Sequence, residues 1–254
     1  MRIAVVTGGS SGIGAAIARG LTARGWHLVL LARGEERLRA VAEEIDGEWE
    51  VCNVAERAEV DAVAARVQQR HPRIELLVNS AGIPGRSSFV HSEPEAIEEI
   101  VRINYLGSVW STRAFIPALE AGRPSHVVNI VSVAGTVAVR RAGPYSAAKH
   151  AQLAFSRSLA VELASRGIHV HTISPGFIET PGFPQTWLTD RPLLRRAVAE
   201  PELVAERVVT AVERGVVETF VPRWYRTFAV IQAVAPGTLA RLQAARRRRA
   251  KRAG

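Results

Sequence analysis

Tyr145 and Lys149 lie four residues apart, and Ser132 lies thirteen positions before the tyrosine. Side chains of these types at this spacing suit acid and base chemistry. A phenol acts as an acid or base near neutral pH only if its pKa is lowered, and an ammonium one helical turn away lowers it. Lys149 is also the only lysine before Lys251. A compact ammonium can do chemistry that a planar guanidinium does poorly. These three residues therefore predict a proton-transfer site.

A glycine-rich segment precedes the first predicted helix. Residues 7–14 read TGGSSGIG and follow a short apolar run. Glycines there let the backbone approach a pyrophosphate, and a helix N-terminus favours its charge. The three residues between Gly8 and Gly12 differ from the commoner G-x-G-x-x-G spacing, and a tight structural turn would look similar. The position after a first strand favours a nucleotide, with contacts from Gly8, Ser10, Ser11, Gly12, Ile13 and Gly14.

The end of the second predicted strand bears on which dinucleotide binds. An acidic side chain there would bind the ribose 2′-hydroxyl of NAD and repel a 2′-phosphate. This strand ends instead in Ala32 and continues with Arg33. A guanidinium suits a 2′-phosphate, so we predict that NADP(H) is preferred over NAD(H). The alternative is a solvated arginine at a helix start, close to Arg37 and Arg39.

Short β-branched runs alternate with helical stretches along the chain, which is the pattern of a doubly wound parallel sheet. We expect strands over 2–7, 27–32, 48–52, 74–79, 126–132, 169–173 and 216–221. Helices are expected over 13–24, 35–45, 57–70, 96–119, 145–165 and 202–214. Prolines interrupt the pattern over 181–201, where we expect a mobile loop with one short helix. The predicted fold class is α/β, a Rossmann-like doubly wound fold with a seven-stranded parallel sheet.

Together these residues resemble the short-chain dehydrogenase/reductase family over residues 2 to about 222. The motifs occur in the family's order: residues 7–14, Asn79-Ser80-Ala81-Gly82, Asn104, Ser132, Tyr145-Ser146-Ala147-Ala148-Lys149, and Pro175-Gly176 followed by Thr180. A Tyr-x-x-x-Lys pair alone arises often by chance. With the preceding serine, in this frame of strands, the match is specific.

The resemblance implies a reversible hydride transfer between nicotinamide and a carbonyl or secondary alcohol. It implies Tyr145 as the general acid in reduction and the base in oxidation. Lys149 would hold the nicotinamide ribose and lower the tyrosine pKa, Ser132 would hydrogen-bond the substrate carbonyl, and Asn104 would help to hold a water in the proton relay. Further cofactor contacts would come from Asn53, Val54, Asn79, Ala81, Gly82, Pro175, Gly176, Ile178 and Thr180. Metal ligands are not predicted.

Two positions depart from the family's pattern. Ser80 stands where a second asparagine is common, and Asn53 where an aspartate is common. Asn53 can still accept a hydrogen bond from an adenine amino group, but it lacks the charge. We therefore expect altered cofactor affinity and intact chemistry.

Structural roles remain alternatives for several of these residues. Ser132 could cap a turn, Asn104 could bend a helix, and Pro175-Gly176 could be a bare turn. A merely packed Tyr145 would leave its pairing with Lys149 unexplained.

Composition bounds the class of protein. A chain of 254 residues that is 47% hydrophobic and 22% charged can form one large α/β domain. A single cysteine, Cys52, excludes an internal disulfide and suits a reducing compartment. The first apolar stretch is too short for a signal peptide or a membrane span. We therefore expect a cytoplasmic protein.

The net charge of +9 lies in the C-terminal tail. After Glu218 there are nine basic residues and no acidic one, so the formal charge of residues 1–218 is zero. We predict a catalytic domain over 1–222 and an apolar and basic extension over 223–254, whose composition suits peripheral contact with an anionic membrane. The alternative is a helix packed beside the substrate pocket, followed by a disordered basic end. Nucleic-acid binding is not predicted, because no base-stacking platform accompanies the arginines.

The predicted activity is that of an NADP-dependent oxidoreductase acting on a lipophilic carbonyl, such as a ketone, a steroid-like compound or an acyl group. An apolar lid suggests this substrate class, with Phe177, Phe183, Trp187, Leu188, Leu193 and Leu194. The competing class is a non-catalytic NADP(H)-binding sensor or scaffold, against which the intact Ser, Tyr and Lys set argues. The family forms its main dimer contact with the helices over 96–119 and 145–165, so a homodimer or homotetramer is expected.

Overall fold

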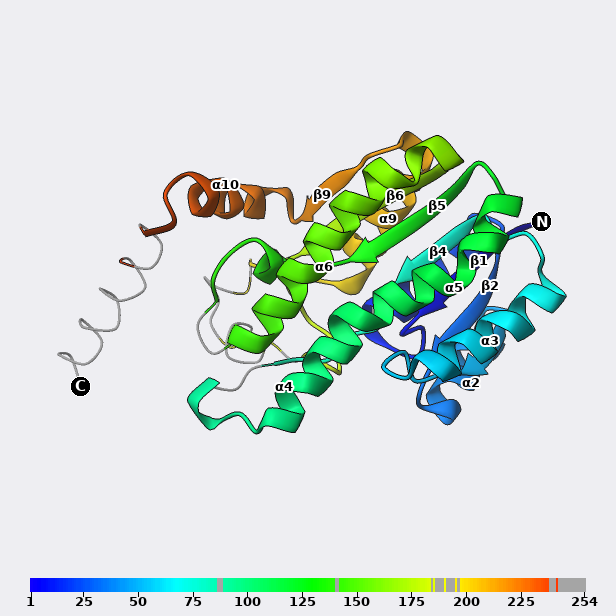
Figure 1. The fold of residues 1–254 in the computed structure, drawn as a ribbon, viewed down its shortest axis with the longest axis horizontal. Coiled ribbons are helices and arrows are strands. Elements are labelled where there is room, and N and C mark those ends of the chain that lie inside the picture. Colours follow the sequence, from blue (N-terminus) through cyan, green and yellow to red (C-terminus); the bar gives the residue numbers. More distant parts are fainter. Residues whose placement is uncertain are drawn as a thin grey trace.

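The structure, a computed structural model, describes residues 1–85, 89–139, 142–183, 185, 190, 195, 197–237 and 241. Seven parallel strands form its central sheet in the order β3-β2-β1-β4-β5-β6-β9 (Figure 1). They are β1 (Arg2–Thr7), β2 (Trp26–Ala32), β3 (Glu48–Val51), β4 (Leu76–Asn79), β5 (Ser125–Ile130), β6 (Ile168–Pro175) and β9 (Glu218–Val221). The predicted seven-stranded parallel sheet is confirmed, and each strand begins and ends within two residues of its predicted bounds.

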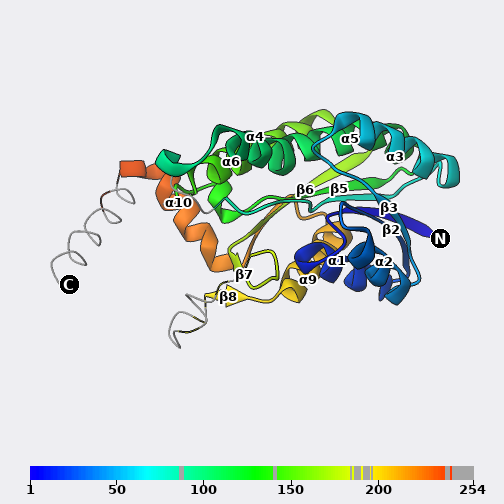
Figure 2. The same ribbon diagram turned by 90° about the horizontal axis from the view of Figure 1, so that it is seen from below.

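Helices cover both faces of the sheet (Figure 2). One face carries α1 (Gly12–Thr22), α2 (Glu35–Glu44) and α9 (Pro201–Arg214), and the other carries α3 (Arg57–Arg70), α4 (Pro94–Val101), α5 (Gly107–Ala121) and α6 (Gly143–Glu162). Successive side chains of a strand point to opposite faces. Along β1, Ala4 and Val6 therefore enter one apolar core and Val5 enters the other. Burial on both sides explains why β1, β2 and β4 are apolar at nearly every position.

The strand order reverses between β1 and β4, since β2 and β3 lie on one side of β1 and β4, β5, β6 and β9 on the other. Open α/β sheets bind ligands in the crevice outside the carboxyl ends of the strands at such a point. The glycine-rich loop after β1 meets the loop after β4 here. A Cβ added at Gly8 would lie 2.8 Å from Cα of Ala81, so the two loops are in close contact.

The predicted helix over 96–119 is not one regular helix. The structure has α4, then a π-helical turn over Arg102–Leu106, then α5. Asn104 lies inside the turn, and its Nδ2 donates to the carbonyl of Ile100 at 3.0 Å. A side chain that bonds the backbone of the preceding turn competes with regular helical hydrogen bonding. Asn104 therefore lies where the regular α-helix is replaced by the π-helical turn.

Two further regions lie beyond the predicted elements. Short strands β7 (Phe177–Ile178) and β8 (Val198–Ala199) pair in parallel, and the sequence analysis missed them. Much of the predicted loop and short helix over 181–201 lies outside the described residues. Beyond β9, a turn over Arg223–Tyr225 leads to α10 (Arg226–Val234) at one end of the molecule (Figure 1). None of the described helices has both the length and the apolar character needed to cross a bilayer.

Candidate active site

A cleft of about 400 Å³ lies at the carboxyl ends of the strands. The segments after β1, β2, β3, β4, β5 and β6 and the start of α6 form its walls. All the predicted site residues except Asn79 line it: Gly8, Ser10, Ser11, Gly12, Ile13, Gly14, Arg33, Asn53, Val54, Ala81, Gly82, Asn104, Ser132, Tyr145, Lys149, Pro175, Gly176, Ile178 and Thr180.

The glycine-rich loop forms one end of the cleft with its backbone. Gly8 and Gly12 have φ values of +71° and +53°, which favour glycine. A Cβ at Gly14 would collide with the carbonyl oxygen of Gly8, so a side chain there would push the loop open. Ser11 begins α1 without a side-chain hydrogen bond to the helix backbone. The first N–H groups of α1 are thus available to an anion, and this end of the cleft fits a pyrophosphate.

Two arginines border the next part of the cleft, beyond the end of β2. Arg33 and Arg37 both line it. The Arg33 guanidinium lies 3.5 Å from a carboxylate oxygen of Glu99, and both side chains are about half exposed. An exposed ion pair of this kind contributes little to stability, so a phosphate could replace the carboxylate at low cost.

Asn53 lines the cleft two residues after the end of β3. Its Oδ1 accepts a hydrogen bond from the backbone N–H of Ala55 at 3.2 Å, and its own N–H donates to Glu59 at 2.9 Å. A carbonyl oxygen has two lone pairs, so Oδ1 can accept one further hydrogen bond.

Asn79 lies beneath the cleft rather than in its wall. Its side chain is buried, and Nδ2 donates to Oγ1 of Thr112 at 3.0 Å and to Oδ1 of Asn129 at 2.8 Å. Asn129 in turn donates to Ser156 at 2.9 Å. The residue predicted as a direct cofactor contact therefore joins β4 to α5 and β5, because it lies on a buried face of the sheet.

Ser132 follows β5 and lines the cleft while capping a short turn. Its Oγ accepts a hydrogen bond from the backbone N–H of Ala134 at 3.1 Å, at the start of the 3-10 turn over Val133–Gly135. The structural alternative for this serine is thus observed, but it does not exclude the chemical one. A hydroxyl that accepts a hydrogen bond still has a proton to donate.

Tyr145 and Lys149 lie one turn apart on α6, with the lysine Nζ 6.0 Å from the centre of the tyrosine ring. Phe183 lies on another side of the phenol, its ring centre 6.0 Å away. Lys149 is 4% exposed, and its Nζ donates to the carbonyl of Ile130 at 3.0 Å and to Oε1 of Gln152 at 2.8 Å. Burial lowers the pKa of the Lys149 ammonium to about 7, because desolvation disfavours its charge.

Sequence reasoning missed Gln152, which holds this lysine. Gln152 is fully buried and donates from Nε2 to Oγ of Ser108 on α5 at 2.7 Å. The second bond orients the amide, so Oε1 points at the ammonium. Its spacing of three residues from Lys149 places both on one helical face, which was the available signal.

Asn104 reaches the cleft from the π-helical turn. Its Oδ1 accepts from the N–H of Ile83 at 3.2 Å, and its Nδ2 donates to the carbonyl of Ile83 at 3.1 Å. A Cβ added at Gly82 would lie 2.8 Å from this Oδ1 and 3.9 Å from Nζ of Lys149. Asn104 therefore fixes the loop after β4 beside the lysine.

The first residues of the tail pack against the wall of the cleft. Tyr225 is buried, and a Cβ at Gly176 would collide with its ring. Its hydroxyl donates to the carbonyl of Ala197 at 3.1 Å, and Phe177 packs against the ring with a centroid distance of 6.3 Å. The first residues after β9 are thus part of the site's frame.

Fold and site together define an α/β protein with a nucleotide cleft at the switch point of its sheet and a Ser, Tyr and Lys set in the cleft wall. The family described as short chain dehydrogenase matches residues 2–190. The chain belongs to this family and is an oxidoreductase of this type.

Several proteins that are similar to this chain are named as reductases. The chain is 35% identical over 181 residues to 3-oxoacyl-(acyl-carrier-protein) reductase FabG of Escherichia coli, covering 70% of this chain and 74% of that protein. The structure of actinorhodin polyketide ketoreductase with NADPH superposes with a TM-score of 0.78 at 31% identity, covering 86% and 94% of the two chains. An alcohol dehydrogenase of Thermococcus sibiricus, solved with 5-hydroxy-NADP, gives a TM-score of 0.78 at 25% identity, covering 87% and 95%.

Proposed function

We propose that this chain is an NADP(H)-dependent dehydrogenase/reductase that interconverts a carbonyl and a secondary alcohol, with Ser132, Tyr145 and Lys149 as its catalytic residues. One observation carries the proposal: these three side chains line the same cleft as the glycine-rich loop after β1, whose glycines leave its backbone open to a pyrophosphate. The relatives named as reductases support the reaction class.

The preference for NADP(H) rests on the charge beside the end of β2. Arg33 and Arg37 both border the cleft there, and the strand ends in Ala32 rather than in an acid. A guanidinium pairs well with a 2′-phosphate, which an acidic side chain would repel. The two structural relatives solved with NADPH and 5-hydroxy-NADP support the same preference.

When bound, the nicotinamide donates or accepts the hydride. In reduction Tyr145 gives its phenolic proton to the oxygen of the new alcohol, and in oxidation the phenolate takes that proton back. The Ser132 hydroxyl donates a hydrogen bond to the substrate oxygen and so holds the carbonyl carbon at the hydride donor.

The Lys149 ammonium supports this proton transfer by its hydrogen bonds and its charge. An ammonium has three N–H donors, and Ile130 and Gln152 accept two of them. The third remains for a ribose hydroxyl or the tyrosine oxygen. A positive charge there stabilises the phenolate, which makes Tyr145 a usable acid and base near neutral pH.

We propose a lipophilic ketone or acyl carbonyl as the substrate. Phe183 beside Tyr145 gives the cleft an apolar wall near the proton donor, and Ile83 and Ile178 also line it. The other predicted lid residues, Trp187, Leu188, Leu193 and Leu194, lie outside the described residues. The named ketoreductases among the relatives support an acyl-type ketone.

The test is consumption of NADPH and NADH by the purified protein with apolar ketones and 3-oxoacyl thioesters. Tyr145→Phe is expected to abolish turnover while NADPH binding, followed by fluorescence, stays nearly unchanged. Tyr105→Phe is the matched control, because Tyr105 packs edge-on against Phe155 with a centroid distance of 6.1 Å and does not line the cleft. Retained turnover in Tyr145→Phe would refute the proton-donor role. Tight NADPH binding without turnover of any substrate would favour the competing sensor or scaffold.

Two contacts with partners are also proposed. The first is a homodimer or homotetramer that uses α5 and α6, which lie side by side on one face of the sheet (Figure 2) and which the family uses in this way. The second is a peripheral contact of the tail with an anionic membrane. It is supported by α10, which buries none of its side chains and leaves Phe228, Val230 and Val234 exposed. The basic residues after 241 lie outside the described residues.

A further inference from the structure

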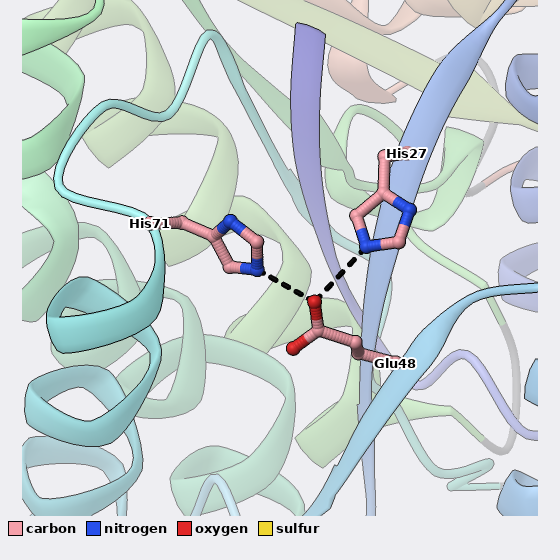
Figure 3. A group of neighbouring side chains, drawn as sticks. All are labelled: His27, Glu48 and His71. Atoms are coloured by element: carbon pink, nitrogen blue, oxygen red, sulfur yellow. Dashed lines mark hydrogen bonds and ion pairs between the residues drawn. The ribbon is translucent and has the colours of Figure 1, made fainter. Parts of the chain in front are cut away.

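Three side chains from separate elements meet near the amino-terminal ends of β2 and β3 (Figure 3). They are His27 near the start of β2, Glu48 at the start of β3, and His71 directly after α3. We propose that His27, Glu48 and His71 bind a zinc ion. Among the described residues they are the one group of histidine, cysteine and acidic side chains whose ligand atoms all lie within 4.8 Å of one another.

The distances between the ligand atoms suit a metal site. Nε2 of His27 lies 3.0 Å from Oε1 of Glu48, and Nε2 of His71 lies 2.7 Å from the same oxygen. Zinc is bound tetrahedrally at about 2.0–2.2 Å by nitrogen and oxygen, which places neighbouring ligand atoms about 3.3 Å apart. Each of these two nitrogen–oxygen distances would lengthen by well under an ångström to admit the ion, and the ligand atoms of all three side chains lie within 4.8 Å of one another. Figure 3 shows both rings pointing their Nε2 atoms at the carboxylate.

Sheet register explains why these residues meet. Val29 of β2 pairs with Glu48 of β3, and His27 lies two residues before Val29. The side chains of His27 and Glu48 therefore point to the same face of the sheet. That face is covered by α3, whose last turn brings His71 back to this edge. The site is therefore at the opposite end of the strands from the cleft, which Ala32 lines.

Two neighbouring arginines bind the other carboxylate oxygens and leave Oε1 of Glu48 to the histidines. Arg70 binds Oε2 of Glu48 at 2.9 Å, and Arg66 and Arg70 bind the two oxygens of Glu50 at 2.8 and 2.9 Å. Two guanidinium groups thus balance two carboxylates, and Oε1 of Glu48 is left to the histidines. A hydrogen-bonded second oxygen orients a ligating carboxylate, as outer-shell partners do at metal sites.

The donor set favours zinc or a transition metal over calcium and magnesium. Two imidazoles and one carboxylate suit zinc, whereas calcium and magnesium take oxygen ligands. The side chains of His27, Glu48 and His71 are 23%, 31% and 13% exposed, so solvent can reach the site and supply a water as fourth ligand. Both rings would then carry their remaining proton on Nδ1. A bound ion would tie the end of α3 to β2 and β3, which predicts greater thermal stability.

The experiment uses the full chain after removal of metal with a chelator. Zinc is added, its binding is followed by equilibrium dialysis and calorimetry, and melting is measured with and without it. We expect one zinc ion per chain and, at a hundred times the Kd, a rise in Tm of about 5–10 °C. His71→Gln and Glu48→Gln should each weaken zinc binding at least about tenfold and abolish the shift measured against the same variant without metal.

A second histidine group supplies the control. His126, His169 and His171 lie on β5 and β6, with Nδ1 of His126 2.9 Å from Nε2 of His171. His169→Gln should leave zinc binding unchanged. NADPH binding by every variant checks that it is folded, and Co²⁺ in place of zinc should give the visible absorption of a four-coordinate nitrogen and oxygen site. The proposal is overturned if the wild-type chain binds no zinc, if His71→Gln binds it equally well, or if only His169→Gln loses it.

Discussion

Gln152 is expected to keep Lys149, the lysine that we propose is catalytic, positively charged. The informative change is Gln152→Leu, which nearly preserves volume but removes the oxygen that lies 2.8 Å from Nζ of Lys149. The lysine would then have the carbonyl of Ile130 as its remaining protein acceptor of those described. An ammonium that loses an acceptor in a buried site loses its proton more easily, so the pKa of Lys149 should fall further below its ordinary value.

The size of the effect follows from the hydrogen bond that is lost. A hydrogen bond to a charged group contributes about 1.5–3 kcal/mol, and one pKa unit corresponds to about 1.4 kcal/mol. The pKa of Lys149, about 7 in the wild type, should therefore fall by about 1–2 units. In the mechanism proposed above, carbonyl reduction needs the ammonium, so its rate should fall as pH rises through this pKa. In the variant that fall should occur about 1–2 pH units lower, and activity at pH 7 should drop about 5- to 50-fold.

The assay is kcat/KM for NADPH as a function of pH, because this ratio reports ionisations of the free enzyme. Ser108→Ala is the graded comparison, since it breaks the bond that orients Gln152 but keeps Oε1, the acceptor of Lys149. Both variants leave a buried polar group without its partner and should lose stability by about 1–3 kcal/mol. The alkaline limb should move further in Gln152→Leu than in Ser108→Ala, because only the leucine removes the acceptor of Lys149. Coincident pH profiles for Gln152→Leu and the wild type, with NADPH still bound, would refute the reasoning.

Three further outcomes are expected. Arg33→Ala should raise KM for NADPH about tenfold or more and leave KM for NADH unchanged, because a charge-assisted hydrogen bond is lost; an equal rise for both cofactors contradicts this role. Gly14→Ala should abolish NADPH binding in a fluorescence titration, because its Cβ collides with the carbonyl of Gly8, whereas Gly20→Ala, with 3.4 Å to the nearest side-chain atom, should bind normally. Truncation after Gln243 should reduce co-sedimentation with anionic vesicles, and equal sedimentation of both proteins would exclude the electrostatic contact.

Local patterns predicted the frame of this protein well. The alternation of apolar strands and helical segments predicted the seven-stranded parallel sheet, and TGGSSGIG predicted the loop after β1. Tyr145 and Lys149 could be paired because they lie one turn apart on one helix. The helix over 96–119 was predicted as regular, since the partner that draws Asn104 into the π-helical turn, Ile83, is 21 residues away in the chain.

What the sequence by itself determined is therefore what short windows encode: backbone preferences, the period of apolar side chains, and glycines where no Cβ fits. The tertiary structure alone decided that Ser108 fixes Gln152, that Tyr225 packs on Gly176, and that His27 and His71 meet at Glu48. Each of these contacts joins segments whose separation depends on strand order, register and helix length. A side chain's neighbours across the sheet follow from the packing of the whole chain, which no local pattern contains.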